Sequence, residues 1–182
     1  SDLLAELGFD AGKAQVTRDA PAWFHPGRSA SLRLGPKTVL AHFGVIGREE
    51  LGTLRKLGSR LQGHPANRLC PGIEASTGSL GQGLSIAQGM ALASKLDGNR
   101  FRVWCMIGDG ESQEGQIWEA AMSAPKFGLD NLTVFLDYNK GQIDGHTKEV
   151  MDLEPIADKW KAFNWDVQEI DGHDLNQIIN AL

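Results

Sequence analysis

The sequence predicts an α/β fold in which an open parallel β-sheet is flanked by helices. Short apolar segments typical of buried strands alternate with longer helix-like segments, in units of roughly 30 residues. Glycine-containing turns separate these segments, as expected for strands joined by helical crossovers. With 182 residues, 41% of them hydrophobic and 23% charged, the chain suits one globular domain with an additional arm.

The first 37 residues are expected to form an irregular amino-terminal arm. Residues 11–37 contain five basic residues and one acidic residue, together with Pro21, Pro26 and Pro36. They show no sustained period of 3.6 or 2, the periods that would indicate a helix or a strand. We therefore place the start of the regular domain at residue 38, and expect the arm to be irregular or to fold only against another surface.

Regular patterns begin at Thr38 and continue through residues 38–182. A predicted helix over 48–57 would end at Gly58, and Asp97-Gly98 is a typical stop for a helix over 79–96. The other predicted elements are strands over 101–107, 132–136 and 165–170 and helices over 113–127, 153–163 and 175–182. Their alternation indicates consecutive strand–helix–strand units.

Charge and cysteine usage argue against several classes of function. The net charge of −5 gives no electrostatic basis for binding nucleic acid or an anionic membrane. The sequence has no signal-peptide pattern and no apolar run long enough to cross a bilayer. Cys70 and Cys105 are isolated, which fits a reducing compartment and provides no zinc motif. These features predict a soluble cytoplasmic protein.

Two polar turns follow neighbouring predicted strands. The turn GDG at 108–110 follows the strand over 101–107, and DYNKG at 137–141 follows the strand over 132–136. Ligands of open α/β sheets bind at the carboxyl ends of the strands. Asp109, Asn139 and the backbone carbonyl of Gly141 would supply the hard oxygen ligands that Mg²⁺ prefers, with phosphate oxygens completing the coordination. The pattern therefore predicts a magnesium and phosphate site.

Each part of this pattern also has a structural interpretation. A GDG turn alone is common after a strand, and an Asn in that place often forms only an Asx-turn. The pairing of the two turns, with a helix and a strand between them, is much more specific. The segment GSLGQG at 78–83 does not fit a dinucleotide fingerprint, because its spacing differs and no clear strand precedes it. His42, His146 and His173 are expected to be structural or surface residues.

Five stretches in order resemble the transketolase family. They are LGSRLQGHP, PGIEASTGSLGQGLSIAQGMALA, GDGESQEGQIWEAAMSA, DYNKGQIDG and EIDGHD, and the resemblance covers residues 38–182 almost continuously. GDG followed after just under thirty residues by Asn is also similar to the thiamine-diphosphate signature that transketolases share with decarboxylases and 2-oxo-acid dehydrogenases. The resemblance implies the thiamine-diphosphate-binding fold, with Mg²⁺, or Ca²⁺ or Mn²⁺ as a substitute.

The resemblance also implies roles for individual residues. Asp109, Asn139 and the carbonyl of Gly141 would bind the metal. Cofactor contacts are implied for Gly78, Leu80, Gly108, Asp109, Gly110, Glu111 and Asn139, with Gly78 and Leu80 near the aminopyrimidine. His64 would contact cofactor-bound substrate, and Glu114 and Glu119 would be catalytic acidic residues near a subunit interface, where carboxylates link paired active sites. On one helix these two glutamates would lie about 140° apart, so only one could face the cofactor; favourable charge early in a helix is the alternative for both.

Two departures from the family qualify this resemblance. Counted back from LAHFG, Pro36 stands where the family has a histidine, and proline has neither ring nitrogens nor a backbone N–H. Residues 11–36 lack family character, so we expect either a misassigned stretch of sequence or real divergence. The family's pyrimidine-binding domain and the later part of its diphosphate-binding domain do not follow in this sequence. The chain thus resembles the amino-terminal subunit of a split transketolase, possibly shortened.

The predicted function follows from this resemblance. The chain would bind thiamine diphosphate and magnesium and transfer a two-carbon ketol unit between phosphorylated sugars, as in the pentose phosphate pathway. A separate carboxy-terminal subunit would carry the pyrimidine-binding domain, and self-association would give a heterotetramer. The alternatives are a subunit of a related synthase or decarboxylase with the same cofactor, and a non-catalytic scaffold subunit.

Overall fold

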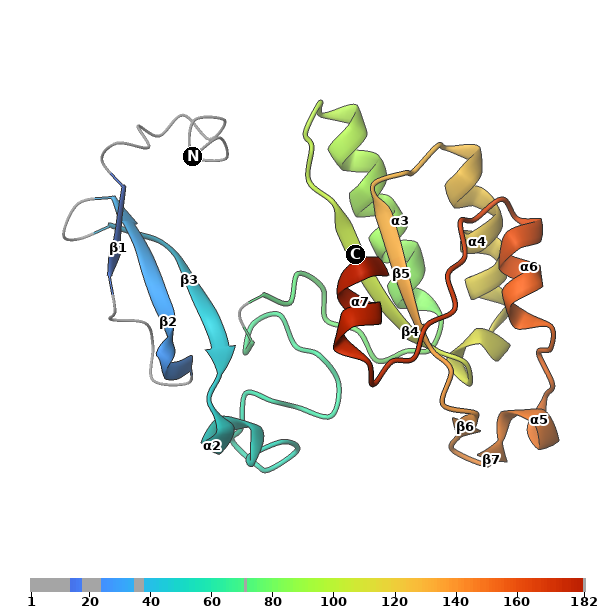
Figure 1. The fold of residues 1–182 in the computed structure, drawn as a ribbon, viewed down its shortest axis with the longest axis horizontal. Helices are drawn as coiled ribbons and strands as arrows, with labels where there is room; N and C mark the ends of the chain where they lie inside the picture. The colour runs from blue at the N-terminus through green and yellow to red at the C-terminus, as the bar shows by residue number, and fades with distance from the viewer. Residues whose placement is uncertain (1–13, 18–23, 35–37, 71, 182) are drawn as a thin grey trace. The chain divides into compact units, whose positions relative to one another are not determined.

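The computed structural model describes residues 14–17, 24–34, 38–70 and 72–181 (Figure 1). The chain divides into two compact units, Ser1–Ser76 and Thr77–Leu182. We describe each unit by itself. The division falls well after residue 38, where the sequence pattern placed the start of the regular domain.

The described strands of the first unit form a three-stranded antiparallel sheet. Its order is β1 (Ala14–Thr17), β2 (Phe24–Leu34) and β3 (Thr38–Ile46). The expected irregular arm over 1–37 is therefore wrong for residues 14–17 and 24–34, because these residues pair along their backbones. The β2–β3 register shifts between Phe24 and Ser29, where Pro26 has no backbone N–H to donate. Pro36 lies outside the described residues.

The helix expected over 48–57 is shorter in the structure. Helix α2 spans Arg48–Leu51 and is followed by turns. Arg55 has a φ of +63°, a left-handed conformation that cannot continue a right-handed helix. The sequence pattern therefore located the start of this helix correctly and overestimated its length.

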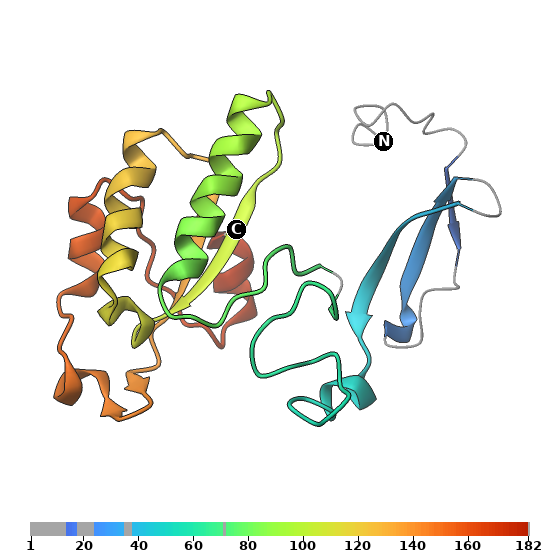
Figure 2. The same ribbon diagram turned by 180° about the vertical axis from the view of Figure 1, so that it is seen from behind.

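The second unit contains the predicted parallel pairing. Strands β4 (Val103–Gly108) and β5 (Leu132–Asp137) run parallel in one register, from Val103 opposite Leu132 to Gly108 opposite Asp137. Helices α3 (Gln82–Leu96) and α4 (Gly115–Lys126) lie beside each other along the strands (Figure 2). The predicted α/β class, with a parallel sheet flanked by helices, is confirmed.

Small and aliphatic side chains form the core between this sheet and its helices. One face of β4 contributes alternate residues, and α3 and α4 contribute mainly alanines, whose short side chains let the helices approach closely. The buried members include Val103, Cys105 and Ile107 from β4, Leu84, Ala87 and Ala91 from α3, and Ile117, Ala120, Ala121 and Ala124 from α4. This packing fixes the carboxyl ends of β4 and β5, where the polar turns begin.

The remaining elements of the second unit are short. They are η2 (Glu111–Gln113), β6 (Gly141–Gln142), β7 (Gly145–His146), α5 (Thr147–Val150), α6 (Ile156–Ala162) and α7 (Leu175–Ala181). The strand predicted over 165–170 is wrong, because these residues adopt no regular secondary structure. Trp165 instead packs edge-on against Trp160, with ring centroids 5.0 Å apart, and its Nε1 donates to the carbonyl of Ala121.

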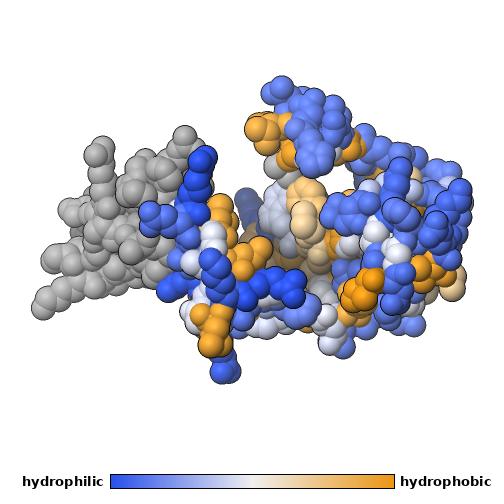
Figure 3. Space-filling model, turned by 90° about the horizontal axis from the view of Figure 1, so that it is seen from below, coloured by the Kyte–Doolittle hydropathy of each residue, from blue (hydrophilic) through white to orange (hydrophobic). Residues whose placement is uncertain are grey.

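The face of the second unit seen in Figure 3 is mostly hydrophilic, with small groups of apolar residues among the hydrophilic ones. Within the described residues, none of the helices combines the length and the apolar character that a bilayer span requires.

Candidate functional site

Asp109 is a buried carboxylate at the carboxyl end of β4. The residue is 1% exposed. Its Oδ1 accepts a 2.9 Å hydrogen bond from the backbone N–H of Gly110, and its Oδ2 accepts bonds from the N–H of Lys140 at 2.9 Å and the hydroxyl of Thr147 at 3.2 Å. A carboxylate buried among donors, at the end of a parallel strand, is held in one orientation.

The second polar turn follows β5 and lies against the first. The backbone N–H of Asp109 donates to the carbonyl of Asp137, so the register of the two strands continues into the turns. In the second turn, Oδ1 of Asn139 accepts from the N–H of Gly141 at 2.8 Å, and Nδ2 donates to Asp137. Lys140 adopts a left-handed conformation with a φ of +64°, which turns its N–H toward Asp109. The structure thus places Asp109, Asn139 and Gly141 in two adjoining turns.

Gly110 lies where the two turns approach each other closely. A Cβ added to Gly110 would be 2.6 Å from the Cβ of Gln142 and 3.2 Å from the carbonyl oxygen of Gly141. A Cβ added to Gly141 would be 3.2 Å from Oδ1 of Asn139. Glycine is therefore needed at Gly110 by steric contact rather than by backbone conformation, since its φ of −61° suits any residue.

The donor set fits a hard divalent cation. A carboxylate has about four acceptor positions. In Asp109, hydrogen bonds occupy three of them, so one position is left for a metal. Within the described ranges, no group of three His, Cys, Asp or Glu side chains could hold a metal. A metal here would depend on the mixed set of the Asp109 carboxylate, the Asn139 amide oxygen and the Gly141 carbonyl, which are the oxygen types that Mg²⁺ prefers.

Glu111 connects the GDG turn to the loop before α3. Its Oε1 accepts a 2.8 Å hydrogen bond from the N–H of Gly81, and its Oε2 accepts a 3.2 Å bond from the N–H of Gly108. The sequence placed Glu111 among the residues that contact the cofactor and gave no sign of this connection. Both carboxylate oxygens bind the backbone, and direct contact of Glu111 with a cofactor stays a prediction.

The loop before α3 contains Gly78 and Leu80. Leu80 is an exposed apolar side chain, with 54% of its surface accessible, next to the buried Gly81. Gly81 is the N-cap of α3, with a left-handed φ of +82°, and a Cβ there would be 3.1 Å from the Cβ of Glu114. An exposed leucine on a fixed loop could pack against an apolar ring, which is the role predicted for it.

Glu114 and Glu119 belong to the start of α4. Glu114 is the N-cap residue, in an extended conformation, and Glu119 lies in the helix. Both are exposed. Because Glu114 precedes the helix, the 140° separation expected for two residues on one helix does not apply to this pair. Their catalytic roles stay predictions.

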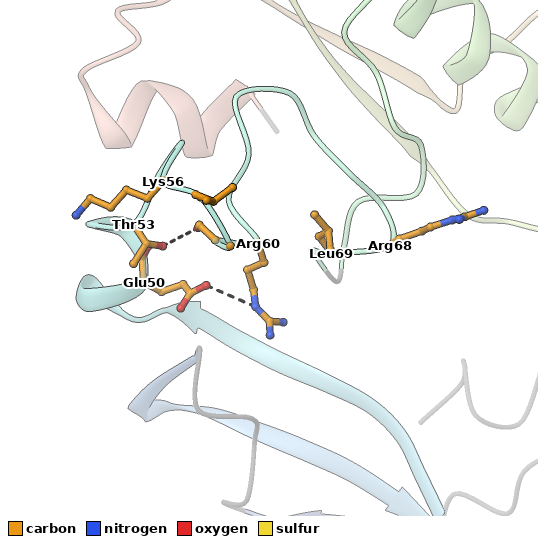
Figure 4. Close-up of a pocket in the computed structure, with 9 residues that line it drawn as sticks. Glu50, Thr53, Lys56, Arg60, Arg68 and Leu69 are labelled. Atoms are coloured by element: carbon orange, nitrogen blue, oxygen red, sulfur yellow. Dashed lines mark hydrogen bonds and ion pairs between the residues drawn. The ribbon is translucent and has the colours of Figure 1, made fainter.

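His64 lies on an exposed loop of the first unit. Arg55 lies beside this loop, and its Nε is 3.4 Å from the position of a Cβ on Gly63. The same unit has an open hollow of about 620 Å³, in which Arg60 pairs with Glu50 at 3.5 Å and Thr53 hydrogen-bonds Ser59 (Figure 4). His64 does not line this hollow, and its proposed contact with substrate stays a prediction.

Two groups near the turns have altered acidity. Burial raises the pKa of the Cys105 thiol from 9.0 to about 11, with a smaller contribution from the charge of Glu111. The hydroxyl of Tyr138 donates to Glu154, and this bond raises the pKa of Tyr138 to about 12. Both groups are therefore protonated at neutral pH, and neither supplies an anionic ligand to the site.

Comparison with known proteins places this site in context. Residues 31–182 match the family model described as transketolase, thiamine diphosphate binding domain. The chain is 52% identical over 144 residues to a 6-deoxy-6-sulfo-D-fructose transketolase subunit from a Clostridium species, covering 79% of this chain and 52% of that protein. It is 48% identical over 138 residues to one of the subunits of an apulose-4-phosphate transketolase from Phocaeicola vulgatus, covering 76% and 49%.

A longer match and a solved structure extend this comparison. A protein of the transketolase family from Sinorhizobium fredii is 44% identical over 187 residues, covering 100% of this chain and 66% of that protein. The crystal structure of transketolase from Campylobacter jejuni matches with a TM-score of 0.65 at 33% identity, covering 75% of this chain and 22% of that one. The chain spans about half the length of the two subunit relatives.

Proposed function

The chain belongs to the transketolase family, and from this membership we propose that it holds the metal and the diphosphate of thiamine diphosphate in a two-subunit transketolase. The observation that carries the proposal is the joining of the two turns by the bond from the N–H of Lys140 to Oδ2 of Asp109. This bond places a buried carboxylate, a carboxamide and a backbone carbonyl at the carboxyl ends of adjacent parallel strands, where open α/β sheets bind ligands.

Asp109, Asn139 and the carbonyl of Gly141 would hold Mg²⁺, for which Ca²⁺ or Mn²⁺ could substitute. The diphosphate would complete the coordination of the metal. The lack of a side chain at Gly110 lets the two turns approach each other closely beside Gly108. When bound, thiamine diphosphate supplies the electron sink that carbon–carbon bond cleavage in a sugar requires. The protein's own contribution here is to bind and orient the metal and the diphosphate.

The remaining roles concern the substrate and a partner subunit. Gly78 and Leu80 would contact the aminopyrimidine, and His64 would stabilise developing charge or move a proton on the substrate. Glu114 and Glu119 would face a subunit interface. The partner would be a carboxy-terminal transketolase subunit that carries the pyrimidine-binding domain, and two such pairs would form a heterotetramer in the cytoplasm. The reaction would transfer a two-carbon ketol unit between phosphorylated sugars.

The names of the relatives support a wider substrate class, anionic ketoses, of which phosphorylated ketoses are one kind. They describe transketolase subunits that act on a sulfonated sugar and on apulose 4-phosphate. Both substrates combine a ketose with an anionic group. We extend the shared chemistry, two-carbon transfer from an anionic ketose, to this chain.

Calorimetric titration of thiamine diphosphate into the chain, with Mg²⁺ and with and without the partner, tests the binding proposal. The expected result is magnesium-dependent binding that Asp109→Asn abolishes and that Asp166→Asn, a change at an exposed carboxylate, leaves intact. An assay of two-carbon transfer from xylulose 5-phosphate with the partner tests the reaction. Absence of binding with and without the partner would contradict the proposal and favour a scaffold subunit.

A further inference from the structure

Glu111 connects the two loops that would contact opposite ends of the proposed cofactor. Its carboxylate accepts the N–H of Gly81 with one oxygen and the N–H of Gly108 with the other, at 2.8 and 3.2 Å. We propose that Glu111 is a positioning residue that sets the loop before α3 at a fixed distance from the turn after β4, so that one thiamine diphosphate can contact both. This inference rests on the proposed function.

The Gly108 end of this connection leads to the metal site. Gly108 lies opposite Asp137 in the parallel register and directly precedes Asp109. The hydroxyl of Ser112 also donates to the carbonyl of Gly108 at 2.8 Å, so both backbone groups of this glycine are bound by η2. The position of Glu111 relative to the metal-binding carboxylate is therefore fixed.

The Gly81 end leads to the loop with the exposed Leu80. Gly81 is buried, adopts a left-handed conformation and begins α3. The close approach of Gly81 to Glu114 leaves little room for Gly81 to move. The N–H of Gly81 is also held by its hydrogen bond to Glu111. Since Leu80 directly precedes Gly81, a change in this hydrogen bond would move Leu80 relative to Asp109.

A carboxylate suits this connection better than its close analogues do. Two donors approach two different oxygens, and a charged acceptor forms stronger hydrogen bonds than a neutral one. Glutamine has one oxygen acceptor, so its NH₂ group would face one of the two N–H donors. Glu111→Gln therefore removes one of the two bonds at almost constant volume, and Glu111→Ala removes both.

Two ligands of different length distinguish positioning from general support of the fold. Thiamine diphosphate would span both loops, whereas inorganic pyrophosphate would occupy only the turn with Asp109. The full chain, Glu111→Gln, Glu111→Ala and the control Glu49→Gln, a change at an exposed residue of α2, are titrated with each ligand in the presence of Mg²⁺. Circular dichroism establishes that each variant is folded.

If Glu111 positions the loop, the Glu111 variants should bind thiamine diphosphate more weakly but bind pyrophosphate as the parent does. In both Glu111 variants the affinity for thiamine diphosphate falls roughly tenfold or more, the size typical of losing an outer-shell partner. Pyrophosphate affinity stays within about twofold of the parent value, and Glu49→Gln matches the parent for both ligands. Rescue is graded, with Glu111→Gln between the parent and Glu111→Ala.

Three results would overturn the inference. They are equal weakening of both ligands, unchanged binding of thiamine diphosphate, and failure of both Glu111 variants to fold, which would assign Glu111 to stability of the fold. A parent chain that binds neither ligand contradicts the proposed function itself. If the parent chain binds thiamine diphosphate and the Glu111 variants bind it equally well, only the positioning role is contradicted.

Discussion

The backbone N–H of Lys140 donates a 2.9 Å hydrogen bond to Oδ2 of Asp109, and this bond joins two turns that are 31 residues apart in the chain. Lys140 lies between Asn139 and Gly141, the other two proposed metal ligands. Because the donor is a backbone group, the connection depends on the conformation of residue 140 and not on its side chain. The left-handed φ of +64° is therefore a central feature of the proposed metal site.

Substitutions at Lys140 should distinguish the contribution of its backbone to stability from the contribution of its side chain. Lys140→Gly keeps the N–H and favours the left-handed conformation, so we expect unchanged or slightly higher stability and unchanged metal binding. Lys140→Pro removes the N–H and fixes φ near −65°, which should cost about 3 kcal/mol or more in the free energy of unfolding. Urea denaturation measures the difference. Equal stability of the two variants would contradict the role of this backbone bond.

Gly110→Ala should destabilise the second unit through a steric clash. The new Cβ would be 2.6 Å from the Cβ of Gln142, so the turn after β5 must shift, and overpacking of this kind costs about 1–3 kcal/mol. Gly89→Ala in α3 is the matched control, because its Cβ meets nothing within 4 Å and alanine favours a helix by about 1 kcal/mol. Thermal unfolding should show opposite shifts for the two variants. A common sign would contradict the close approach of the two turns.

Trp160 should be the largest single contributor to the packing of α6. The residue is 6% exposed, and its ring lies against the rings of Trp118 and Trp165, at centroid distances of 5.9 and 5.0 Å. Trp160→Ala should cost about 3–5 kcal/mol of unfolding free energy in a urea titration. Trp160→Phe should cost clearly less, because it keeps a ring and removes a buried Nε1 that has no hydrogen-bond partner within the described residues. Equal losses would show that ring packing is not the source of the stability.

Cys105 should react slowly with alkylating reagents while the chain is folded. Burial, then the charge of Glu111, raises the pKa of its thiol from 9.0 to about 11, so the reactive thiolate is scarce at pH 8. A raised pKa stabilises the folded chain below pH 9, and this contribution disappears as the pH rises through about 11. Iodoacetamide labelling of Cys70→Ser, followed by mass spectrometry, should show faster reaction in urea than in buffer. Equal rates in the two conditions would contradict the burial of this thiol.

The sequence pattern correctly predicted strands β4 and β5 and the end of helix α3. Strands β4 and β5 came from apolar runs that end in glycine-containing or polar turns, and the end of α3 came from Asp97-Gly98, where Gly98 has a φ of +70°. The segment over 165–170 has an apolar pattern too, but Trp165 and Val167 pack against the core, Ile170 is exposed, and none of the described strands pairs with the segment. A short apolar pattern indicates burial, whereas strand pairing depends on a neighbour that the pattern does not contain.

The sequence predicts the two turns that form the candidate site, but not the contacts that support them. Asp109, Asn139 and Gly141 lie in turns that the sequence brings to one edge of the sheet. Thr147, which is buried and donates to Asp109, and Glu111, which holds Gly81, act over 38 and 30 residues respectively. No local signal marks such contacts, because they arise only when distant segments pack together. The strands over 14–17 and 24–34 were missed for a similar reason, since their proline and basic residues do not follow a strand-like pattern.

Electron paramagnetic resonance of Mn²⁺, used in place of Mg²⁺, tests the central claim that Asp109 and Asn139 hold the metal of the cofactor. Free Mn²⁺ gives a strong signal that falls when the ion binds. With thiamine diphosphate present, we expect the parent chain and Asp166→Asn to remove the free-ion signal equally. Asp109→Asn and Asn139→Ala should leave the signal close to its level in a sample of cofactor without protein. Uptake of Mn²⁺ by these two variants equal to that of the parent chain would contradict the assignment of the metal site.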